Sequence, residues 1–259
     1  MSADTHEREI TVRITDLSKS YGPTPAVREL SLTLYAGEVF AFLGPNWAGK
    51  TTTLKATTGL LRPDRGTITI CGQALPRDAQ AAKQCLAYVP DQPFIYEKLT
   101  GREFIRFTHE LYGVADDAAA RRTAELARRL DMNGFLDQLC ENYSHGMKQK
   151  VALAAALVHA PRVLVVDEPM VGLDPRTARI TKDIFRELAA GGGTVFMSTH
   201  TLDVAEQLAD RIGIIHRGRL VALGTLAELR KQAQMDGRLE DIFLRLTEEP
   251  QDETAPQAG

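Results

Sequence analysis

The sequence has little of what marks secreted, disulfide-rich or nucleic-acid-binding proteins. It contains three cysteines in 259 residues, Cys71, Cys85 and Cys140, with no C-x-x-C pair, which favours reduced thiols in a cytosolic protein. The net charge of −3 gives no electrostatic footprint for nucleic acid, so we expect no nucleic-acid partner. No internal repeat is visible.

Long apolar segments are also missing. The polar N-terminus lacks the apolar core of a secretory signal. The longest strongly apolar run, Val151 to Val158, is far short of the roughly 20 residues needed to span a bilayer. We therefore expect no direct membrane span and a membrane role only through a partner.

What is present is an alternation of strand and helix patterns. Residues 10–36 alternate apolar and polar positions, and residues 67–70 are typical of another strand of the same small antiparallel sheet. The β-branched run at 163–166 lacks alternation, as in a parallel strand covered on both faces. Helical spacing prevails over about 100–139 and again over roughly 225–246. The pattern predicts an α/β protein.

The most informative stretch is a phosphate-binding loop. An apolar strand pattern ends at Gly44, and Pro45, Asn46, Trp47, Ala48, Gly49, Lys50, Thr51 and Thr52 follow at the start of a helical pattern, which is the G-x-x-x-x-G-K-[ST] arrangement. Backbone N–H groups at a helix N-terminus favour a bound triphosphate. Lys50 would reach the β- and γ-phosphates, and the Thr51 hydroxyl would hold Mg²⁺. We expect an ATP site.

Carboxylates and a histidine follow two further predicted strands. Asp167 and Glu168 come directly after residues 163–166, at the strand end where open α/β sheets bind ligands. Asp167 would hold Mg²⁺, and Glu168 would orient or deprotonate the attacking water. His200 ends the next strand pattern and could contact the γ-phosphate and that water. Each feature is common in isolation, but together with Lys50 they predict a hydrolytic site.

The complete motif set resembles that of ATP-binding subunits of ABC transporters. The resemblance covers about residues 8–246. The signature beginning at Ser144 and the segment Pro90–Glu97 are similar to those of bacterial export-type systems, in which the ATPase and the permease are separate chains. The segments that carry it, in order, are Gly44–Thr51, Tyr143–Lys150, Val163–Pro169, Gly172–Pro175 and Ser198–His200.

The resemblance implies a fold and a domain organisation. The expected fold is a P-loop NTPase of the ABC ATPase type, with a mostly parallel core sheet, an N-terminal antiparallel β-subdomain and an inserted helical subdomain. The ATP-binding domain would span 8–246, with the helical subdomain at about 97–160 and a C-terminal helical extension at about 225–246. Residues 1–7 and 247–259 are expected to be disordered tails.

The resemblance also implies residue roles. Tyr21 would stack on adenine, Glu168 would be the catalytic carboxylate, and His200 the switch histidine. Asp174 would lie between the two nucleotide sites of a head-to-tail dimer. The signature residues Ser144, Gly146 and Gln149 would close over ATP bound to the other subunit. Partners would be a second ATPase subunit, in a homodimer or heterodimer, and a separate membrane permease, so this subunit would be cytoplasmic and peripheral on the inner face of the cell membrane.

Three positions depart from the family pattern. Trp47 replaces a glycine, which bears on loop geometry and nucleotide affinity. Asp91 stands where a Mg²⁺-contacting glutamine is usual, so either Asp91 ligates the ion or Gln92 substitutes. His145 replaces a signature glycine.

Two other functions fit parts of the sequence. A soluble ABC-type ATPase acting on ribosomes, DNA or cofactor assembly would usually carry a second cassette, a long coiled coil or a cysteine cluster, and the sequence has none of these. A degenerate regulatory subunit paired with an active partner is favoured only by Trp47. The preferred hypothesis is an export ATPase that dimerises on MgATP.

Overall fold

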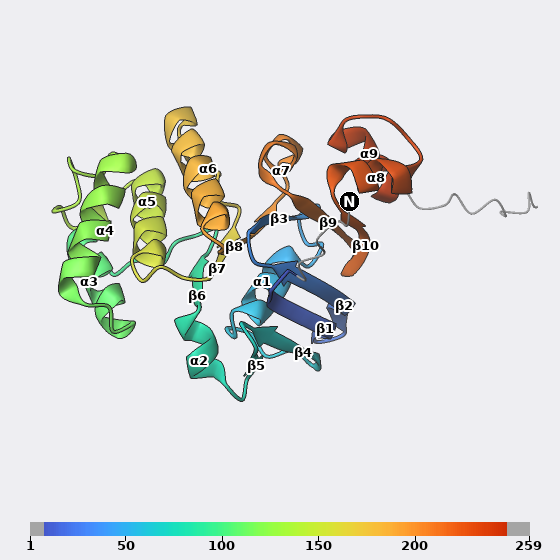
Figure 1. Ribbon diagram of the computed structural model, residues 1–259, viewed down its shortest axis with the longest axis horizontal. Helices are drawn as coiled ribbons and strands as arrows, with labels where there is room; N and C mark the ends of the chain where they lie inside the picture. Colours follow the sequence, from blue (N-terminus) through green and yellow to red (C-terminus); the bar gives the residue numbers. More distant parts are fainter. Residues whose placement is uncertain (1–7, 248–259) are drawn as a thin grey trace, which may run out of the picture.

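The computed structural model describes residues 8–247; the tails predicted to be disordered lie outside the described residues, apart from Thr247. Two sheets form the centre of the molecule (Figure 1). The larger has the strand order β10-β9-β3-β8-β7-β6, in which β9, β3, β8, β7 and β6 are parallel and β10 is antiparallel. Its strands are β3 (Glu38–Leu43), β6 (Leu86–Val89), β7 (Val163–Asp167), β8 (Thr194–Thr199), β9 (Arg211–His216) and β10 (Arg219–Gly224).

The smaller sheet is antiparallel and has the order β2-β1-β4-β5. Its alternating pattern buries one face, with Val12, Ile14 and Leu32 almost fully covered. Those side chains pack against Phe40, Phe42 and Phe196 of the core sheet. The Phe196 ring lies edge-on to Phe40, with centroids 5.7 Å apart, and tilted to Phe42, with centroids 5.9 Å apart. The strands are β1 (Ile10–Tyr21), β2 (Thr24–Tyr35), β4 (Arg65–Ile70) and β5 (Gln73–Leu75).

Helices cover the core sheet and form a separate helical part at the far left of Figure 1. That part contains α3 (Gly101–Leu111), α4 (Asp116–Arg129), the 3₁₀ turn η1 (Cys140–Asn142) and α5 (His145–Leu157). The helices around the sheet are α1 (Lys50–Thr57), α2 (Ala79–Gln84), α6 (Pro175–Ala190) and α7 (Leu202–Leu208). None of the helices within residues 8–247 combines the length and apolarity required to cross a bilayer.

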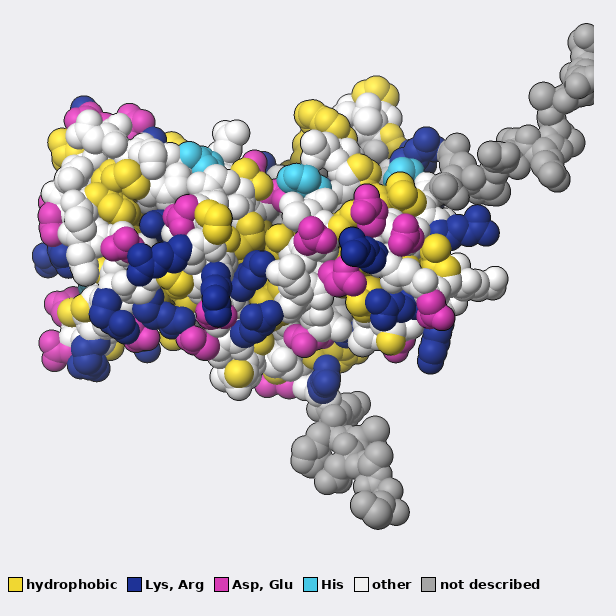
Figure 2. Space-filling view, turned by 90° about the horizontal axis from the view of Figure 1, so that it is seen from above, with side chains coloured by type: hydrophobic (Ala, Val, Ile, Leu, Met, Phe, Trp, Pro, Cys, Tyr) yellow, Lys and Arg dark blue, Asp and Glu magenta, His cyan; other side chains and the backbone are white. Residues whose placement is uncertain are grey.

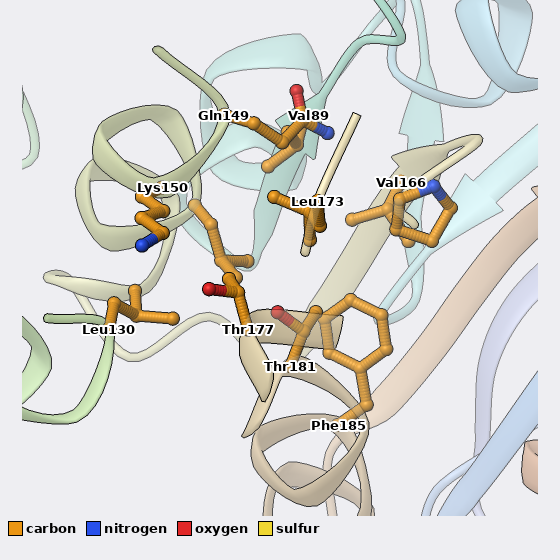
Figure 3. Close-up of a pocket in the computed structure, with 11 residues that line it drawn as sticks. Val89, Leu130, Gln149, Lys150, Val166, Leu173, Thr177, Thr181 and Phe185 are labelled. Atoms are coloured by element: carbon orange, nitrogen blue, oxygen red, sulfur yellow. The ribbon is translucent and has the colours of Figure 1, made fainter. Parts of the chain in front are cut away.

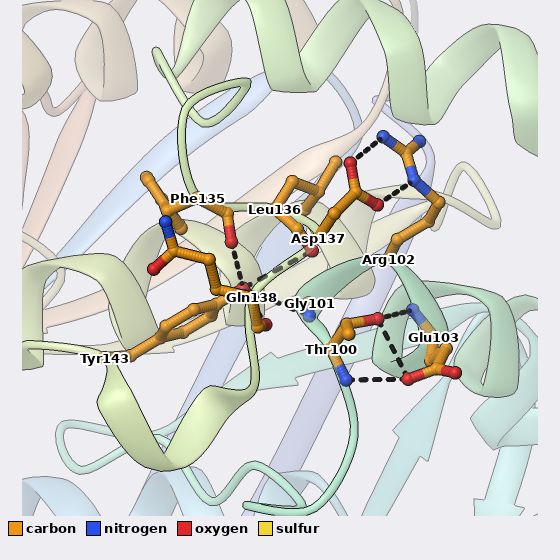
Figure 4. Close-up of polar contacts among 9 residues, drawn as sticks. All are labelled: Thr100, Gly101, Arg102, Glu103, Phe135, Leu136, Asp137, Gln138 and Tyr143. Carbon is orange, nitrogen blue, oxygen red and sulfur yellow. Dashed lines mark hydrogen bonds and ion pairs between the residues drawn. The ribbon is translucent and has the colours of Figure 1, made fainter.

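Polar contacts fix the entrance and exit of the helical part (Figure 4). Thr100 and Glu103 form a reciprocal capping box at the start of α3. The Tyr143 hydroxyl donates to Phe135 O at 2.9 Å and accepts from the Gly101 N–H at 3.1 Å. The chain leading into α3 and the chain leading into α5 are therefore held together.

The exposed faces of these helices carry charges of both signs. Arg129 forms a two-bond pair with Glu187 at 2.6 and 2.8 Å, and Arg106 bonds Glu110 one turn away. Figure 2 shows Lys and Arg side chains standing among Asp and Glu on this side of the molecule. Arg121 and Arg128 of α4 are exposed to solvent, whereas Arg129 is partly buried against Glu187.

The C-terminal extension differs from the single helical stretch expected over 225–246. It consists of α8 (Leu226–Ala233) and α9 (Leu239–Thr247). Gln234 caps α8 in the left-handed conformation, with φ of 54°, and this ends the helix because a helix cannot continue through such a residue. Asp236 and Gly237, a typical turn pair, follow within the break between the two helices.

Stability is expected to depend on pH through His159, which stacks on Tyr112 with ring centroids 3.7 Å apart. Burial, assisted by Arg122, lowers the pKa of His159 from 6.5 to about 4. Between these two pH values His159 is protonated in the unfolded chain but neutral in the folded protein. The free energy of unfolding should therefore rise as the pH increases from 4 to 6.5, and this stabilisation should be fully present above pH 6.5. Urea unfolding at several pH values measures this. His159→Phe keeps the stacking and should flatten the dependence; an unchanged dependence would contradict the assignment.

Candidate active site

The phosphate loop connects the carboxyl end of β3 to α1. Helix α1 starts at Lys50, its N-cap is Gly49 in the left-handed region, and neither a side-chain cap nor an acidic residue occupies its first turn. The first turn of a helix has unpaired N–H groups and a partial positive charge. A lysine instead of a carboxylate at this end leaves the site strongly electropositive, which suits an anion.

The Lys50 ammonium is held over the loop. Its Nζ donates to Gly44 O at 2.7 Å and to Pro45 O at 3.2 Å, and it lies 3.6 Å from Glu168 Oε1. Both charged side chains are largely buried, at 7% and 13% exposure, so solvent screens their attraction less than at the surface. The loop lysine and the predicted catalytic carboxylate are therefore neighbours.

Two loop glycines are required by close backbone contacts. A Cβ at Gly49 would lie 2.5 Å from Ala26 O, and one at Gly44 would lie 2.5 Å from Ile215 O. Gly49 also has φ of 110°. The loop is thus pressed against β2 and the end of β9, and its shape depends on these small residues.

Gly49→Ala should therefore abolish nucleotide binding, because the loop must move away from Ala26 O to accept a methyl group. Gly192→Ala is the matched control: its φ is 86°, but nothing lies within 4 Å of the added Cβ. The control carries only the left-handed strain of about 1 kcal/mol. ATP titration by calorimetry and thermal melting of both variants separate strain from clash; equal ATP affinities would contradict the loop account.

Trp47 adopts the glycine-like backbone that its position implies, with φ of 68°. That conformation destabilises a non-glycine residue by roughly 1–2 kcal/mol. The side chain is 100% exposed, so the indole points away from the body of the protein and leaves the loop's backbone uncovered. Pro45 and Asn46 beside it are also exposed.

The acidic edge of the site lies at the end of β7. Asp167 is 2% exposed and accepts a short hydrogen bond from the Ser198 hydroxyl on the neighbouring β8. The Glu168 N–H donates to the same hydroxyl and to Ser198 O, each at 3.2 Å. Glu168 itself has φ of 50°, a strained conformation that turns its side chain toward Lys50.

His200 closes the other side of Glu168. Its Nδ1 lies 2.9 Å from Glu168 Oε2, and its backbone N–H donates to the same oxygen at 3.3 Å. Glu168 thus stands between Lys50 on one oxygen and His200 on the other. The structure brings together three predicted residues that are 32 to 150 positions apart in the sequence.

Asp91 belongs to the same electrostatic neighbourhood. Desolvation, followed by the negative charges of Asp167 and Glu168, raises the pKa of Asp91, while His145 and His200 act in the opposite direction. Desolvation and then the Asp167 and Asp91 charges also raise the pKa of the buried Tyr88 hydroxyl. Asp91 is therefore within electrostatic reach of Asp167 and Glu168.

The signature segment forms a second helix N-terminus. Ser144 caps α5 and accepts from the Met147 N–H at 3.3 Å, and no acidic residue lies in the first turn. The His145 ring lies against Gly172, where an added Cβ would be 2.4 Å from His145 Cδ2. The start of α5 and the loop before α6 therefore form one continuous surface.

Gln149 is buried, unlike the other two signature residues, Ser144 and Gly146. It is 3% exposed and lines a small cavity between α5 and α6 with Leu173 and Thr181 (Figure 3). Within residues 8–247 its Oε1 has no hydrogen-bond partner. A direct contact of this side chain with nucleotide on another subunit, as the resemblance implies, would need Gln149 to leave the cavity.

The remaining predicted residues lie at the surface. Tyr21 ends β1 and is half exposed, free to stack on a planar ligand. Asp174 caps α6 and accepts from the Thr177 N–H at 2.9 Å and the Thr177 hydroxyl at 2.6 Å, and these bonds lower the pKa of Asp174. Thr51 is exposed on the first turn of α1.

Sequence reasoning missed Ser198 and the floor of the phosphate loop. Ser198 bonds both Asp167 and Glu168, and its position two residues before His200 on a strand was the available signal. Ala26 limits the space beside Gly49, and Ile215 limits the space beside Gly44. Neither the residue type nor the sequence position of Ala26 and Ile215 predicts this role.

Comparison with known proteins decides the family. Residues 27–171 match the family model described as ABC transporter. The chain belongs to the ABC transporter family. It is 35% identical over 237 residues to the ABC-type transporter ATP-binding protein EcsA of Bacillus subtilis (strain 168), covering 91% of this chain and 96% of that protein.

Other relatives of this ABC family member are named for resistance or export. It is 38% identical to the daunorubicin/doxorubicin resistance ATP-binding protein DrrA of Streptomyces peucetius, over 85% of this chain and 66% of that one. It is 39% identical to the Nod factor export ATP-binding protein I of Burkholderia orbicola (strain AU 1054), over 81% and 69% of the two chains.

The solved structures agree with the sequence comparison. An ATP-binding subunit of an ABC transporter superposes with a TM-score of 0.88 at 33% identity, over 92% of this chain and all of that one. The expected fold class, an ABC-type P-loop NTPase, is confirmed. The protein is an ATP-binding subunit of a bacterial ABC transporter and an ATPase.

Proposed function

We propose that this subunit dimerises head to tail on MgATP, hydrolyses it at two shared sites, and drives a separate membrane permease in the export direction. The observation that carries the proposal is the Lys50–Glu168–His200 arrangement at the carboxyl ends of β3, β7 and β8. A cation for phosphate, a carboxylate and a histidine meet there beside an electropositive helix start.

The ATP phosphates would occupy the N-terminus of α1. There the γ-phosphate would replace Glu168 as the nearest anion to Lys50. Glu168, then held by His200 through two contacts on Oε2, would orient and deprotonate the attacking water. Tyr21 would support the adenine.

Mg²⁺ would be held by oxygen donors of Thr51, Asp167 and Asp91, with Gln92 as the alternative to Asp91. Desolvation and then the charges of Asp167 and Glu168 raise the pKa of Asp91, and a cation would relieve that repulsion. Within residues 8–247 no three His, Cys, Asp or Glu side chains form a complete metal site. That fits Mg²⁺, which is usually bound by one or two carboxylates together with substrate phosphates. When bound, it would neutralise charge developing on the phosphates.

The second subunit supplies the other half of each site. In one chain, α1 packs against β2, β7 and β8, whereas α5 packs against α3, α4 and β6. The helix start at Ser144 and Gly146 would therefore serve ATP held by the phosphate loop of another subunit, which produces two equivalent sites about a two-fold axis. Asp174, beside the same surface, would lie between them.

The permease would dock on aromatic side chains that follow Asp91. Phe94 is 78% exposed, and its ring lies 5.8 Å from that of Tyr96, which in turn lies 5.5 Å from Phe107 of α3. Exposed aromatic clusters mark interaction sites. Because the charges of Asp167 and Glu168 act on Asp91, a change at the nucleotide would reach this surface within a few residues. The names of the relatives support export.

A pull-down tests the proposal. Tagged Glu168→Gln protein is incubated with MgATP and detergent-solubilised native membranes, and bound chains are identified by mass spectrometry. A multi-helix membrane protein in stoichiometric amount is the expected result, and it should be lost in a Phe94→Ala/Tyr96→Ala variant that still binds ATP. Recovery of ribosomal or nucleic-acid partners without a membrane protein would contradict the proposal.

A further inference from the structure

Trp47 is the only tryptophan of the chain, and it lies in the phosphate loop, three residues before Lys50. Its side chain is 100% exposed, whereas Lys50 of the same loop is 6% exposed. The loop therefore presents a large aromatic ring outward from the place where the phosphates bind.

This exposure is unusual in its setting. A single exposed apolar side chain needs no explanation by itself, but Trp47 also holds a left-handed backbone, with φ of 68°. A glycine would fit that backbone without strain. Tryptophan is one of the residue types most enriched among interface anchors. A ring that is strained and fully in water in one subunit is suited to burial against another.

The surface that would meet this ring is the start of α5. A phosphate bound between the phosphate loop of one subunit and the Ser144 helix start of the other would bring residues beside the loop close to residues beside Ser144. His145 is exposed there, with its ring against Gly172. An imidazole beside an indole gives a stacked or, when protonated, a cation–π contact.

We infer that Trp47 is an interface residue that packs against a second copy of this chain, on the surface around His145 of the partner subunit, when MgATP closes the dimer. The inference rests on the proposed function, because it requires the head-to-tail dimer. It assigns to Trp47 a role in subunit closure and none in contacting nucleotide within its own subunit.

The single tryptophan supplies its own probe. Glu168→Gln protein is titrated with MgATP while tryptophan emission, acrylamide quenching and sedimentation are recorded together. A blue shift and loss of quenching should accompany dimer formation and depend on protein concentration. Dimer formation with unchanged, fully quenchable emission would overturn the inference and leave the proposed function standing. Failure to dimerise despite bound ATP would overturn both.

A second variant separates contact with the partner from contact with nucleotide. Glu168→Gln/Ser144→Arg places a bulky side chain at the α5 start and should block closure, and its ATP binding is measured separately by equilibrium dialysis. Its emission should not change when ATP binds. A blue shift in this monomer would assign Trp47 to the nucleotide and overturn the inference.

Substitution of the ring completes the test. In the Glu168→Gln background, Trp47→Gly should weaken the ATP-dependent dimer by about tenfold or more, as for an aromatic interface anchor, and Trp47→Phe should recover most of that loss. ATP affinity of the monomer should stay the same or rise as strain is relieved. A Trp47→Gly dimer of undiminished affinity would contradict the inference.

Discussion

Glu168→Gln should reduce ATP turnover by about 10²- to 10⁴-fold, the usual contribution of a general base, while ATP binding is retained. Glutamine has the same size but no charge, so it neither accepts a proton from water nor attracts Lys50, 3.6 Å away in the wild-type protein. Because hydrolysis would no longer reopen the dimer, closed dimers should accumulate. Phosphate release under saturating MgATP and sedimentation measure the two effects.

Glu110→Gln is the control for that substitution. Glu110 is exposed, and within residues 8–247 its ion pair is with Arg106 one turn away on α3, so its neutralisation should leave turnover near the wild-type value. Normal turnover in Glu168→Gln would show that this carboxylate is not the general base and would make His200 the next candidate.

Lys50→Ala should weaken ATP binding by roughly 10²-fold or more, because removal of one partner from a buried charge contact typically costs about 2–5 kcal/mol. The variant also leaves Gly44 O, which accepts from Nζ at 2.7 Å, without its donor. Calorimetric titration with MgATP gives the dissociation constant directly.

Lys55→Ala is the matched control on the same helix. Lys55 lies in the last turn of α1 and is exposed, so its removal changes net charge equally without touching the loop. Equal losses of affinity in the two variants would mean that overall charge, and not the position of Lys50, governs binding.

Much of the fold could be predicted from local patterns. Alternation at residues 10–36 indicated β1 and β2 because one face of the antiparallel sheet is solvated, and the unbroken run at 163–166 indicated β7 because both of its faces are covered. The site residues Lys50, Glu168 and His200 could be grouped because each follows a strand of one parallel sheet, whose carboxyl ends share an edge.

Other features depend on contacts between distant segments and leave no local signal. The burial of Gln149 depends on Leu173, Thr177 and Thr181, which line the same small cavity and lie 24 to 32 positions away in the sequence. By contrast, the break between α8 and α9 begins at Gln234 and does have a local signal, because the turn pair Asp236-Gly237 follows it. The space that fixes Gly49 is set by Ala26, which precedes it by 23 positions.

If one active site contains the phosphate loop of one subunit and the α5 start of another, a mixture of two inactive variants should recover activity. Lys50→Ala lacks a phosphate-loop cation, and Ser144→Asp keeps the cap of α5 but places a negative charge where the signature would meet phosphate, so each alone should be inactive. A mixed dimer has one intact site, built from the loop of the Ser144→Asp subunit and the signature of the Lys50→Ala subunit. An equimolar mixture should therefore regain about a quarter of wild-type turnover by statistics of two-fold pairing. A mixture as inactive as its components would contradict the shared-site account.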